Sequence, residues 1–291
     1  MIGLYPIDSK MANLALMKIS SWVKQNGNIS ELFMSLNSPN YKQVYVSKVF
    51  DYSSMPNDIM CDDVIYGGTG HDITTQLPYY VEECSPDYSI YPNCDYTIQL
   101  FSRGCIRKCK FCVVPQKEGG IRSVEPMIPN PNGKWVEVFD NNFFANPKWR
   151  EAIEWLSKYN QPVNFHGIDA RILTDDMCRS LMTLKHKKQI HTAWDNIKDK
   201  IKWDKIIKII PPYKIMVYVL IGYNSTEEED LHRINTLREH GIDPFVMPFN
   251  KNEQYQKRFA RWVNHKAIFK TVEWEAYGKY SKKEQHEELQ S

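Results

Sequence analysis

The 291-residue sequence contains no apolar run that approaches the ~20 residues needed to span a membrane. Its first residues, Met-Ile-Gly-Leu-Tyr-Pro-Ile-Asp, also lack the basic start and long apolar core of a secretory signal peptide. Hydrophobic residues make up 42% and charged residues 25% of the chain, as in ordinary soluble domains. We therefore expect a cytoplasmic protein with no membrane partner.

The chain also lacks a strong charge of either sign. Its 37 basic and 35 acidic side chains give a net charge of +2, so charge alone gives no argument for nucleic-acid binding. The exception is a lysine stretch from Lys185 to Lys214, which has nine lysines and three acidic residues. Such a stretch is most often a solvated face, and the alternative is a patch that binds phosphate groups.

The seven cysteines do not form the pattern of a disulfide framework. An odd number of thiols fits a reducing compartment and a metal site better. Cys105, Cys109 and Cys112 fall within eight residues, in the segment Ser-Arg-Gly-Cys-Ile-Arg-Lys-Cys-Lys-Phe-Cys-Val-Val-Pro. A disulfide uses thiols in pairs, whereas iron–sulfur clusters are held by cysteine thiolates. The basic side chains in this segment favour thiolates and offset the negative charge of a cluster.

A zinc site with three cysteines and one histidine is the alternative use of these thiols. Zinc sites usually place the fourth ligand at short spacing, but the nearest histidines are the distant His71 and His166. We therefore favour iron–sulfur. Cys61, Cys84 and Cys94 show no Cys-x-x-Cys spacing and are expected to be isolated structural thiols rather than a second cluster.

The Cys-x-x-x-Cys-x-x-Cys spacing, with Phe111 just before the last cysteine, resembles the radical S-adenosylmethionine (SAM) superfamily. The sequence Ser-Arg-Gly-Cys-x-x-x-Cys-x-Phe-Cys resembles that of the branch whose members carry an N-terminal cobalamin-binding domain. The resemblance implies a [4Fe-4S] cluster on Cys105, Cys109 and Cys112 whose open iron chelates SAM. It also implies an electron donor such as flavodoxin or ferredoxin, and cleavage of SAM to a 5′-deoxyadenosyl radical.

Residues 1–75 are expected to form a small Rossmann-like α/β domain. Strands are predicted at 2–5, 32–34, 43–50 and 63–66, and a helix at 11–23. This order resembles a shortened cobalamin-binding domain, with Gly67-Gly68 in the place of the family's glycine pair. The family's Asp-x-His-x-x-Gly motif is missing, and none of the eight histidines lies in the right loop to bind cobalt. Cobalamin is therefore possible but not favoured, and a packing or gating domain is preferred.

Residues 76–95, rich in Pro, Tyr and Asp, are predicted to be a linker. From residue 96 to 250, strand and helix patterns alternate, which is typical of a parallel sheet. The strands are expected at 96–101, 135–139, 162–165, 189–194, 214–221 and 244–248, and the helices at 147–159, 175–185, 198–210 and 225–239. Thr174 is the candidate N-cap of the second of these helices, and Ser225 or Thr226 with Glu228 or Glu229 is the candidate capping box of the last. With the cysteines after the first strand, this agrees with the superfamily's partial (β/α)6 TIM-like barrel. Residues 251–291 are expected to form a helical C-terminal tail.

Ligands of parallel α/β sheets bind at the carboxyl ends of the strands. The chain places polar side chains and glycines at most of these ends. Besides the three cysteines, the candidate site residues are Phe111, Asp140, Asn141, Asn142, His166, Arg171, Asp195, Ile221, Gly222, Tyr223 and Met247.

The resemblance assigns SAM contacts to some of these residues. Asp140, Asn141 and Asn142 stand where the superfamily has its Gly-Gly-Glu motif, which holds the SAM amino group, and their oxygens could accept from that ammonium. Arg171 could pair with the SAM carboxylate or an anionic substrate, or could form a surface ion pair instead.

Ile221 and Gly222, where the glycine permits close approach, resemble the adenine-side strand, and Phe111 and Met247 would complete that pocket. Asp195 is expected either to contact the SAM ribose or the substrate, or to cap a helix.

His166 and Tyr223 are the candidates for proton or radical chemistry, and for His166 a structural role is the alternative. Cys178 falls within a predicted helix and is expected to be in the core.

The leading interpretation is a radical SAM enzyme that abstracts hydrogen from an unidentified small molecule, peptide or nucleic acid. One alternative is a cobalamin-dependent radical SAM methyltransferase. A second is a non-catalytic metal-thiolate protein that binds nucleic acid through the lysine stretch and the aromatic tail, although helical tails of this kind more often pack against the domain.

Overall fold

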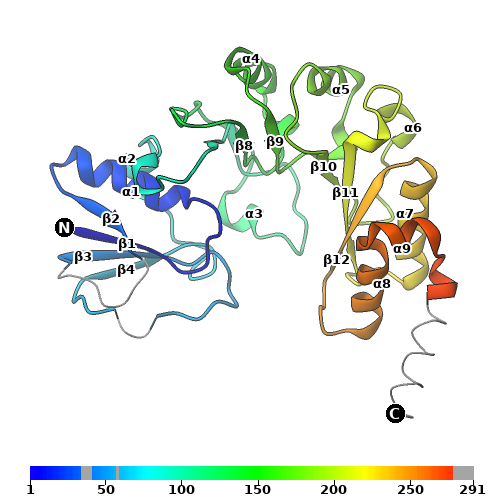
Figure 1. Ribbon diagram of the computed structural model, residues 1–291, viewed down its shortest axis with the longest axis horizontal. Helices are drawn as coiled ribbons and strands as arrows, with labels where there is room; N and C mark the ends of the chain where they lie inside the picture. Colours follow the sequence, from blue (N-terminus) through cyan, green and yellow to red (C-terminus); the bar gives the residue numbers. More distant parts are fainter. Residues whose placement is uncertain (34–40, 57–58, 278–291) are drawn as a thin grey trace, which may run out of the picture. The chain divides into compact units, whose positions relative to one another are not determined.

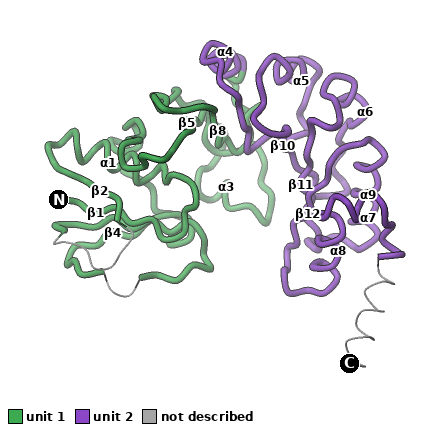
Figure 2. The backbone as a smooth tube through the Cα atoms, in the orientation of Figure 1, with its two compact units in different colours: residues 1–149 green, residues 150–291 purple. Residues whose placement is uncertain are grey.

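The computed structural model describes residues 1–33, 41–56 and 59–277. The protein is a mixed α/β protein with parallel sheets, and it divides into two compact units, Met1–Trp149 and Arg150–Ser291 (Figures 1 and 2). The division falls inside the stretch 96–250 that the sequence assigns to a barrel. Within the described ranges, none of the helices has the length and apolarity required to cross a membrane.

Unit 1 begins with a four-stranded parallel sheet in the order β2-β1-β3-β4. Its strands are β1 (Ile2–Pro6), β2 (Ser30–Leu32), β3 (Gln43–Ser47) and β4 (Val64–Gly67), and helix α1 (Leu14–Gln25) connects β1 to β2. Leu4 of β1 and Leu16 and Met17 of α1 are buried in one core. The side chain of Asn13 accepts from the Leu16 N–H at 3.2 Å, so α1 starts three residues later than predicted.

The glycine loop after β4 packs against its own chain. Gly68 has a φ of +96°, and a Cβ there would lie 2.1 Å from the carbonyl oxygen of Lys48. A Cβ on Gly70 would lie 2.4 Å from the carbonyl carbon of Phe50. These glycines are therefore required by the close approach of two backbone segments.

The rest of unit 1 carries the motif cysteines Cys105, Cys109 and Cys112. Its elements are α2 (Tyr79–Glu82), η1 (Tyr88–Ile90), β5 (Thr97–Gln99), β6 (Ser102–Arg103), α3 (Val114–Lys117), β7 (Arg122–Ser123), β8 (Val136–Val138) and η2 (Phe143–Ala145). Strand β5 pairs with β8 in parallel, and β6 pairs with β7 antiparallel. Val81 and Ile90 lie in the same core as α1, so the segment predicted as a linker is packed rather than extended.

Unit 2 alternates strands and helices. Its elements are α4 (Trp149–Tyr159), β9 (Val163–Phe165), η3 (Ala170–Ile172), α5 (Asp175–Met182), β10 (Ile190–Ala193), α6 (Trp203–Ile206), η4 (Pro212–Lys214), β11 (Ile215–Ile221), α7 (Glu227–Glu239) and β12 (Asp243–Pro248). Strands β10, β11 and β12 form a parallel sheet. Parallel bridges also link Val163 to His186 and Ile168 to Thr192. The alternating pattern predicted a parallel α/β arrangement, and this is confirmed.

The starts of the helices in unit 2 agree with the sequence where a capping residue is present. Thr174 caps α5, and Thr226 and Glu229 form a reciprocal capping box at the start of α7, both as predicted. The helix predicted at 198–210 was wrong in length, because α6 spans only Trp203–Ile206. The residue before it, Lys202, provides no side-chain cap.

The lysine stretch lies on the outside of unit 2. Every lysine in it is exposed except Lys214, which is half-buried, while Trp203, Ile206 and Ile210 point into the core. This is the pattern of a solvated face.

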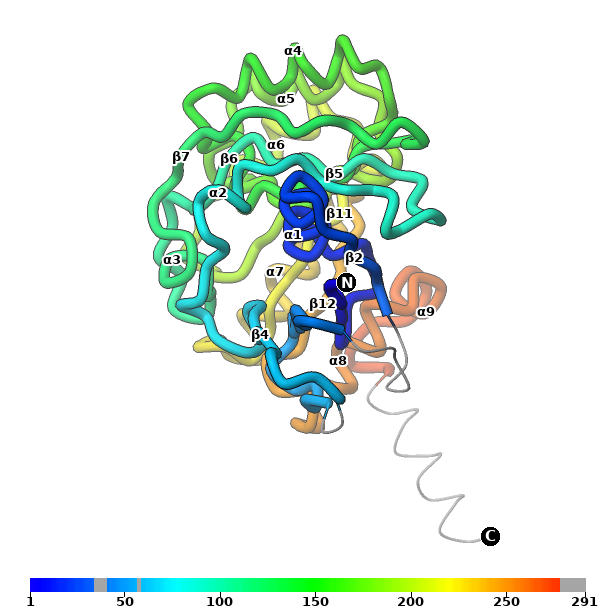
Figure 3. The backbone as a smooth tube through the Cα atoms, turned by 90° about the vertical axis from the view of Figure 1, so that its left-hand side faces the viewer, coloured from blue at the N-terminus to red at the C-terminus, as the bar shows by residue number. Residues whose placement is uncertain are grey.

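The C-terminal tail packs beside β12 (Figures 1 and 3). Its helices are α8 (Gln254–Asn264) and α9 (Lys266–Thr271). Phe259 and Trp262 are fully buried and Phe269 is 7% exposed. The prediction that this tail packs against the domain is therefore confirmed. The last charged residues, 278–291, lie outside the described residues.

Candidate site at the cysteine loop

The three cysteines lie in one loop that is closed at its base. Strands β6 and β7 pair Ser102 with Ser123 and Arg103 with Arg122, so the residues between them form a single excursion of the chain. Cys105, Cys109 and Cys112 are all half-buried, and none of the seven cysteines forms a disulfide. The loop therefore offers three thiols that are neither oxidised nor buried in the core.

Gly104 fixes the point at which this loop leaves the strand. Its φ is +77°, and a Cβ there would lie 2.2 Å from the carbonyl oxygen of Gly120. The next residue, Cys105, donates its N–H to the carbonyl oxygen of Gly119 at 3.2 Å. Only glycine fits this position, because the far side of the loop approaches it so closely.

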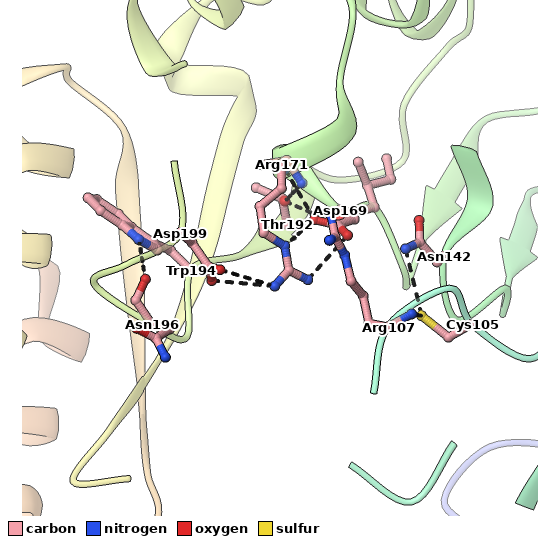
Figure 4. A network of polar contacts seen from close by, with 11 residues as sticks. Cys105, Arg107, Asn142, Asp169, Arg171, Thr192, Trp194, Asn196 and Asp199 are labelled. Carbon is pink, nitrogen blue, oxygen red and sulfur yellow. Dashed lines mark hydrogen bonds and ion pairs between the residues drawn. The ribbon is translucent and has the colours of Figure 1, made fainter. Parts of the chain in front are cut away.

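The first cysteine already has donors directed at its sulfur. The Sγ of Cys105 accepts from the backbone N–H of Arg107 at 3.3 Å and from the side-chain amide of Asn142 at 3.7 Å (Figure 4). Hydrogen bonds to ligand sulfurs are among the features by which proteins tune iron–sulfur clusters. The donor set thus fits a cluster in its chemistry.

The thiols do not converge on one point. Among the residues that the structure describes, no three His, Cys, Asp or Glu side chains are close enough together to hold a metal ion. Binding a cluster therefore requires the cysteine side chains of the loop to turn toward a common centre.

The predicted SAM-amino residues lie beside the loop and differ in their contacts. Asp140 is 1% exposed, and its carboxylate accepts from the N–H of Phe101 at 3.0 Å and from the hydroxyl of Ser102 at 2.5 Å. Burial outweighs these hydrogen bonds and raises the pKa of Asp140 to about 6. Its oxygens already secure the start of β6, while Asn141 and Asn142 contact the cysteine loop itself.

Glu118 is the member of this site that the sequence interpretation missed. Its Oε2 accepts from the N–H of Gly104 and from the side-chain amide of Asn141, both at 2.8 Å. Its Oε1 accepts from Arg103 at 3.2 Å, and Arg103 also pairs with Glu82 at 2.8 Å. The available signal was one carboxylate following five basic residues between positions 103 and 117.

In unit 2, Arg171 is held by two carboxylates (Figure 4). Its guanidinium contacts Asp169 at 2.6 and 3.2 Å and Asp199 at 3.4 Å. Burial alone would lower the pKa of Arg171, but the hydrogen bonds and charges of Asp169 and Asp199 outweigh it and raise that pKa. The loop that carries Arg171 is fixed by Thr192, whose hydroxyl accepts from the N–H of Ala170 at 3.0 Å. Arg171 therefore forms an ion pair, which the sequence analysis gave as the alternative to binding the SAM carboxylate or an anionic substrate.

Three further candidates lie at strand ends of the same unit. Asp195 is half-buried, and burial is the main cause that raises its pKa. His166 is exposed, with its Nε2 3.3 Å from the amide nitrogen of Asn164. Tyr223 packs edge-on against Phe249, with ring centroids 4.8 Å apart.

Gly222 is required by a contact that the sequence did not reveal. Its φ is +72°, and a Cβ there would lie 2.0 Å from the amide nitrogen of Gln256 in α8. The neighbouring Ile221 is fully buried, and its carbonyl accepts from the Phe249 N–H at 3.1 Å. The close approach predicted for adenine at Gly222 is made by the tail helix. Met247 is 37% exposed, and Phe111 of unit 1 is 40% exposed.

A buried ion pair ties together the strand ends of unit 2. Arg233 and Asp230 of α7 are both 0% exposed and 2.5 Å apart. Arg233 also donates to the carbonyl oxygens of Trp194 at 2.7 Å and Leu220 at 2.9 Å. The sequence interpretation did not single out this pair, which joins the carboxyl ends of β10 and β11 to α7.

The other cysteines have structural surroundings. Cys178 is 2% exposed, and burial raises its pKa to about 11, so its predicted place in the core is confirmed. The thiols of Cys61, Cys84 and Cys94 each donate to a backbone carbonyl, at 3.4, 3.3 and 3.4 Å. These separate contacts agree with isolated structural thiols.

Comparison of the chain with protein-family models and with curated proteins gave no match.

Proposed function

We propose that this protein is a radical SAM enzyme that uses a [4Fe-4S] cluster to cleave SAM and abstract hydrogen from a substrate. The observation that carries the proposal is the cysteine loop. It presents three thiols at superfamily spacing that form no disulfide, is closed at its base by β6 and β7, and has an N–H and an amide directed at the sulfur of Cys105.

Cys105, Cys109 and Cys112 would hold the cluster. When bound there, the cluster supplies the electron that splits SAM into methionine and a 5′-deoxyadenosyl radical. An external donor, such as a flavodoxin or ferredoxin, would provide that electron. The protein's part is to hold the cofactor and position the substrate.

Asn142 and Asn141 would act beside the loop. Asn142 donates to the sulfur of Cys105 and so restrains that side chain. Asn141 has its amide nitrogen bound to Glu118, which leaves its carbonyl oxygen as the acceptor for the SAM ammonium. Asp140 would contribute less directly, because its oxygens are engaged by Phe101 and Ser102.

In unit 2, Arg171 would bind the SAM carboxylate only by exchanging a present partner. Its contact to Asp199 is longer than its contact to Asp169, at 3.4 Å against 2.6 Å, and is the one to be displaced. Asp195, Ile221, Gly222 and Met247 remain proposed contacts on the strand ends of that unit. His166 and Tyr223 remain proposed for proton or radical chemistry.

A partial (β/α)6 barrel is part of the same proposal. It is supported by the parallel pairing of β5 with β8 in unit 1 and of β10, β11 and β12 in unit 2. The alternation of these strands with helices also supports it. The competing interpretation as a nucleic-acid-binding protein is weakened, because Phe259, Trp262 and Phe269 of the tail are buried in their own unit.

Anaerobic reconstitution tests the proposal. We expect iron near four atoms per chain, a brown chromophore, and 5′-deoxyadenosine formed from SAM with dithionite. The Cys105→Ala, Cys109→Ala and Cys112→Ala variants should lose both iron and product. The matched control is Cys61→Ala, which removes a half-buried free thiol outside the loop and should retain both. One tightly held zinc ion without SAM cleavage would contradict the proposal.

A further inference from the structure

Glu118 connects the two parts of the cysteine site through a single atom. Its Oε2 accepts from the N–H of Gly104, the residue just before the first cysteine, and from the amide of Asn141, each at 2.8 Å. The Glu118 side chain is 18% exposed, so water competes little for these bonds. One carboxylate oxygen therefore sets the distance between the start of the cysteine loop and Asn141.

The other oxygen of Glu118 is fixed as well. Oε1 accepts from Arg103 at 3.2 Å, and the same guanidinium pairs with Glu82 at 2.8 Å. Glu82 is in turn paired with the buried Lys18 of α1 at 3.1 Å. This chain of alternating charges holds the Glu118 carboxylate in one orientation, because turning it would break contacts at both oxygens.

The orientation of Glu118 determines the orientation of Asn141. A side-chain amide has a donor end and an acceptor end, and a carboxylate can only accept. The amide nitrogen of Asn141 must therefore face Glu118, and its carbonyl oxygen must face away. Without the carboxylate, the amide could flip and present two donors in place of the acceptor.

We propose that Glu118 is a positioning residue that holds the carbonyl oxygen of Asn141 ready to accept from the ammonium group of bound SAM. This inference rests on the proposed function. It assigns to Glu118 a role in recognising the amino group of the ligand, separate from holding the cysteine loop.

The test is Glu118→Gln, which keeps the size of the side chain and replaces one acceptor oxygen with a donor. The matched control is Glu125→Gln in the same unit, because Glu125 is 88% exposed and its ion pair with Lys148 is as long as 3.6 Å. Binding of SAM and of a SAM analogue lacking the α-amino group is measured by equilibrium dialysis on reconstituted protein, together with the iron content.

We expect Glu118→Gln to retain its iron and to bind SAM about tenfold more weakly, the usual effect of losing one hydrogen bond to a charged group. Its affinity for the analogue should be unchanged, because the analogue has no ammonium to recognise. Asn141→Ala should show the same selective loss, and the double variant should be no weaker than Asn141→Ala alone.

The outcomes separate this inference from the proposed function. If the unaltered protein neither binds nor cleaves SAM, the proposed function fails and this inference fails with it. If the unaltered protein cleaves SAM while Glu118→Gln binds SAM with unchanged affinity, only the inference fails. Loss of iron in Glu118→Gln, or equal weakening for SAM and the analogue, would show that Glu118 merely clamps the loop and would overturn the inference.

Discussion

Gly104→Ala should disable the cysteine loop while Gly119→Ala leaves it working. Both glycines have positive φ, +77° and +74°, so alanine costs the same backbone strain at each. They differ in what a Cβ would meet: on Gly104 it would lie 2.2 Å from the carbonyl oxygen of Gly120, whereas on Gly119 it meets nothing within 4 Å. The pair of variants therefore isolates the effect of the close approach.

The magnitude follows from the geometry. A carbon and a carbonyl oxygen need about 3.3 Å between them, so the loop must move by about 1 Å in Gly104→Ala. We expect the shared backbone strain to cost about 1–2 kcal/mol in each variant. The forced shift should add about 1–3 kcal/mol at Gly104 only. The effect of alanine on the unfolded chain is the same at both positions and cancels in the comparison.

Two assays check this prediction. Thermal unfolding should give a melting temperature lower in Gly104→Ala than in Gly119→Ala, by about 2–4 °C for each kcal/mol of difference. After reconstitution, Gly104→Ala should hold less iron and form 5′-deoxyadenosine about a hundredfold more slowly, because a displacement of 1 Å is enough to misplace a reacting group. If the two variants have equal stability and equal iron content, the close contact at Gly104 has no role in shaping the site.

Three further predictions concern stability and pH. Arg233→Met should lower the free energy of unfolding by about 3–5 kcal/mol in urea titrations, because it leaves Asp230 buried without its ion-pair partner. The control is Arg150→Met at an ion pair whose arginine is 71% exposed, and it should change that free energy by less than about 0.5 kcal/mol. The pKa of Asp140 is raised from 3.8 to about 6 in the folded state, so the folded state binds the proton more tightly, and the free energy of unfolding should fall as pH rises from about 4 to about 6. Asp140→Asn should reduce this slope, and an unchanged slope would exclude Asp140 as its source. Trp262→Ala should lower the free energy of unfolding by about 3–5 kcal/mol, because Trp262 is fully buried. The control is Tyr213→Ala, which should have little effect on that free energy because Tyr213 is 70% exposed.

Local signals in the sequence were enough to predict much of the secondary structure. The capping box at Thr226 and Glu229 depends only on residues three positions apart, and it forms as expected. The apolar run ending at Ile221 gives the longest strand of unit 2. Such features are set by neighbours along the chain, and one sequence suffices to find them.

The candidate site depends on contacts that no local pattern encodes. Glu118 meets Asn141 across 23 positions of the chain, and Gln256 comes from the tail helix to meet Gly222. The glycine at 222 was recognised as a place of close approach, but its partner could not be known before the tail was placed. The cysteine motif was visible from its spacing, whereas the arrangement of acids and amides around it was not.

The contact between Asn264 and β12 has a consequence for the outer edge of this sheet. In the described structure β12 pairs with β11 on one side. On the other side, the Val246 N–H donates to the side-chain oxygen of Asn264 at 2.8 Å, and the Asn264 side-chain nitrogen donates to the Val246 carbonyl oxygen at 2.9 Å. Asn264 of the tail helix thus forms the backbone hydrogen bonds that a neighbouring strand would form at this position. An unprotected strand edge can pair with a strand from another molecule. Helix α8 therefore covers this part of the sheet edge, and any shortened version of the chain intended for study should keep α8 through Asn264.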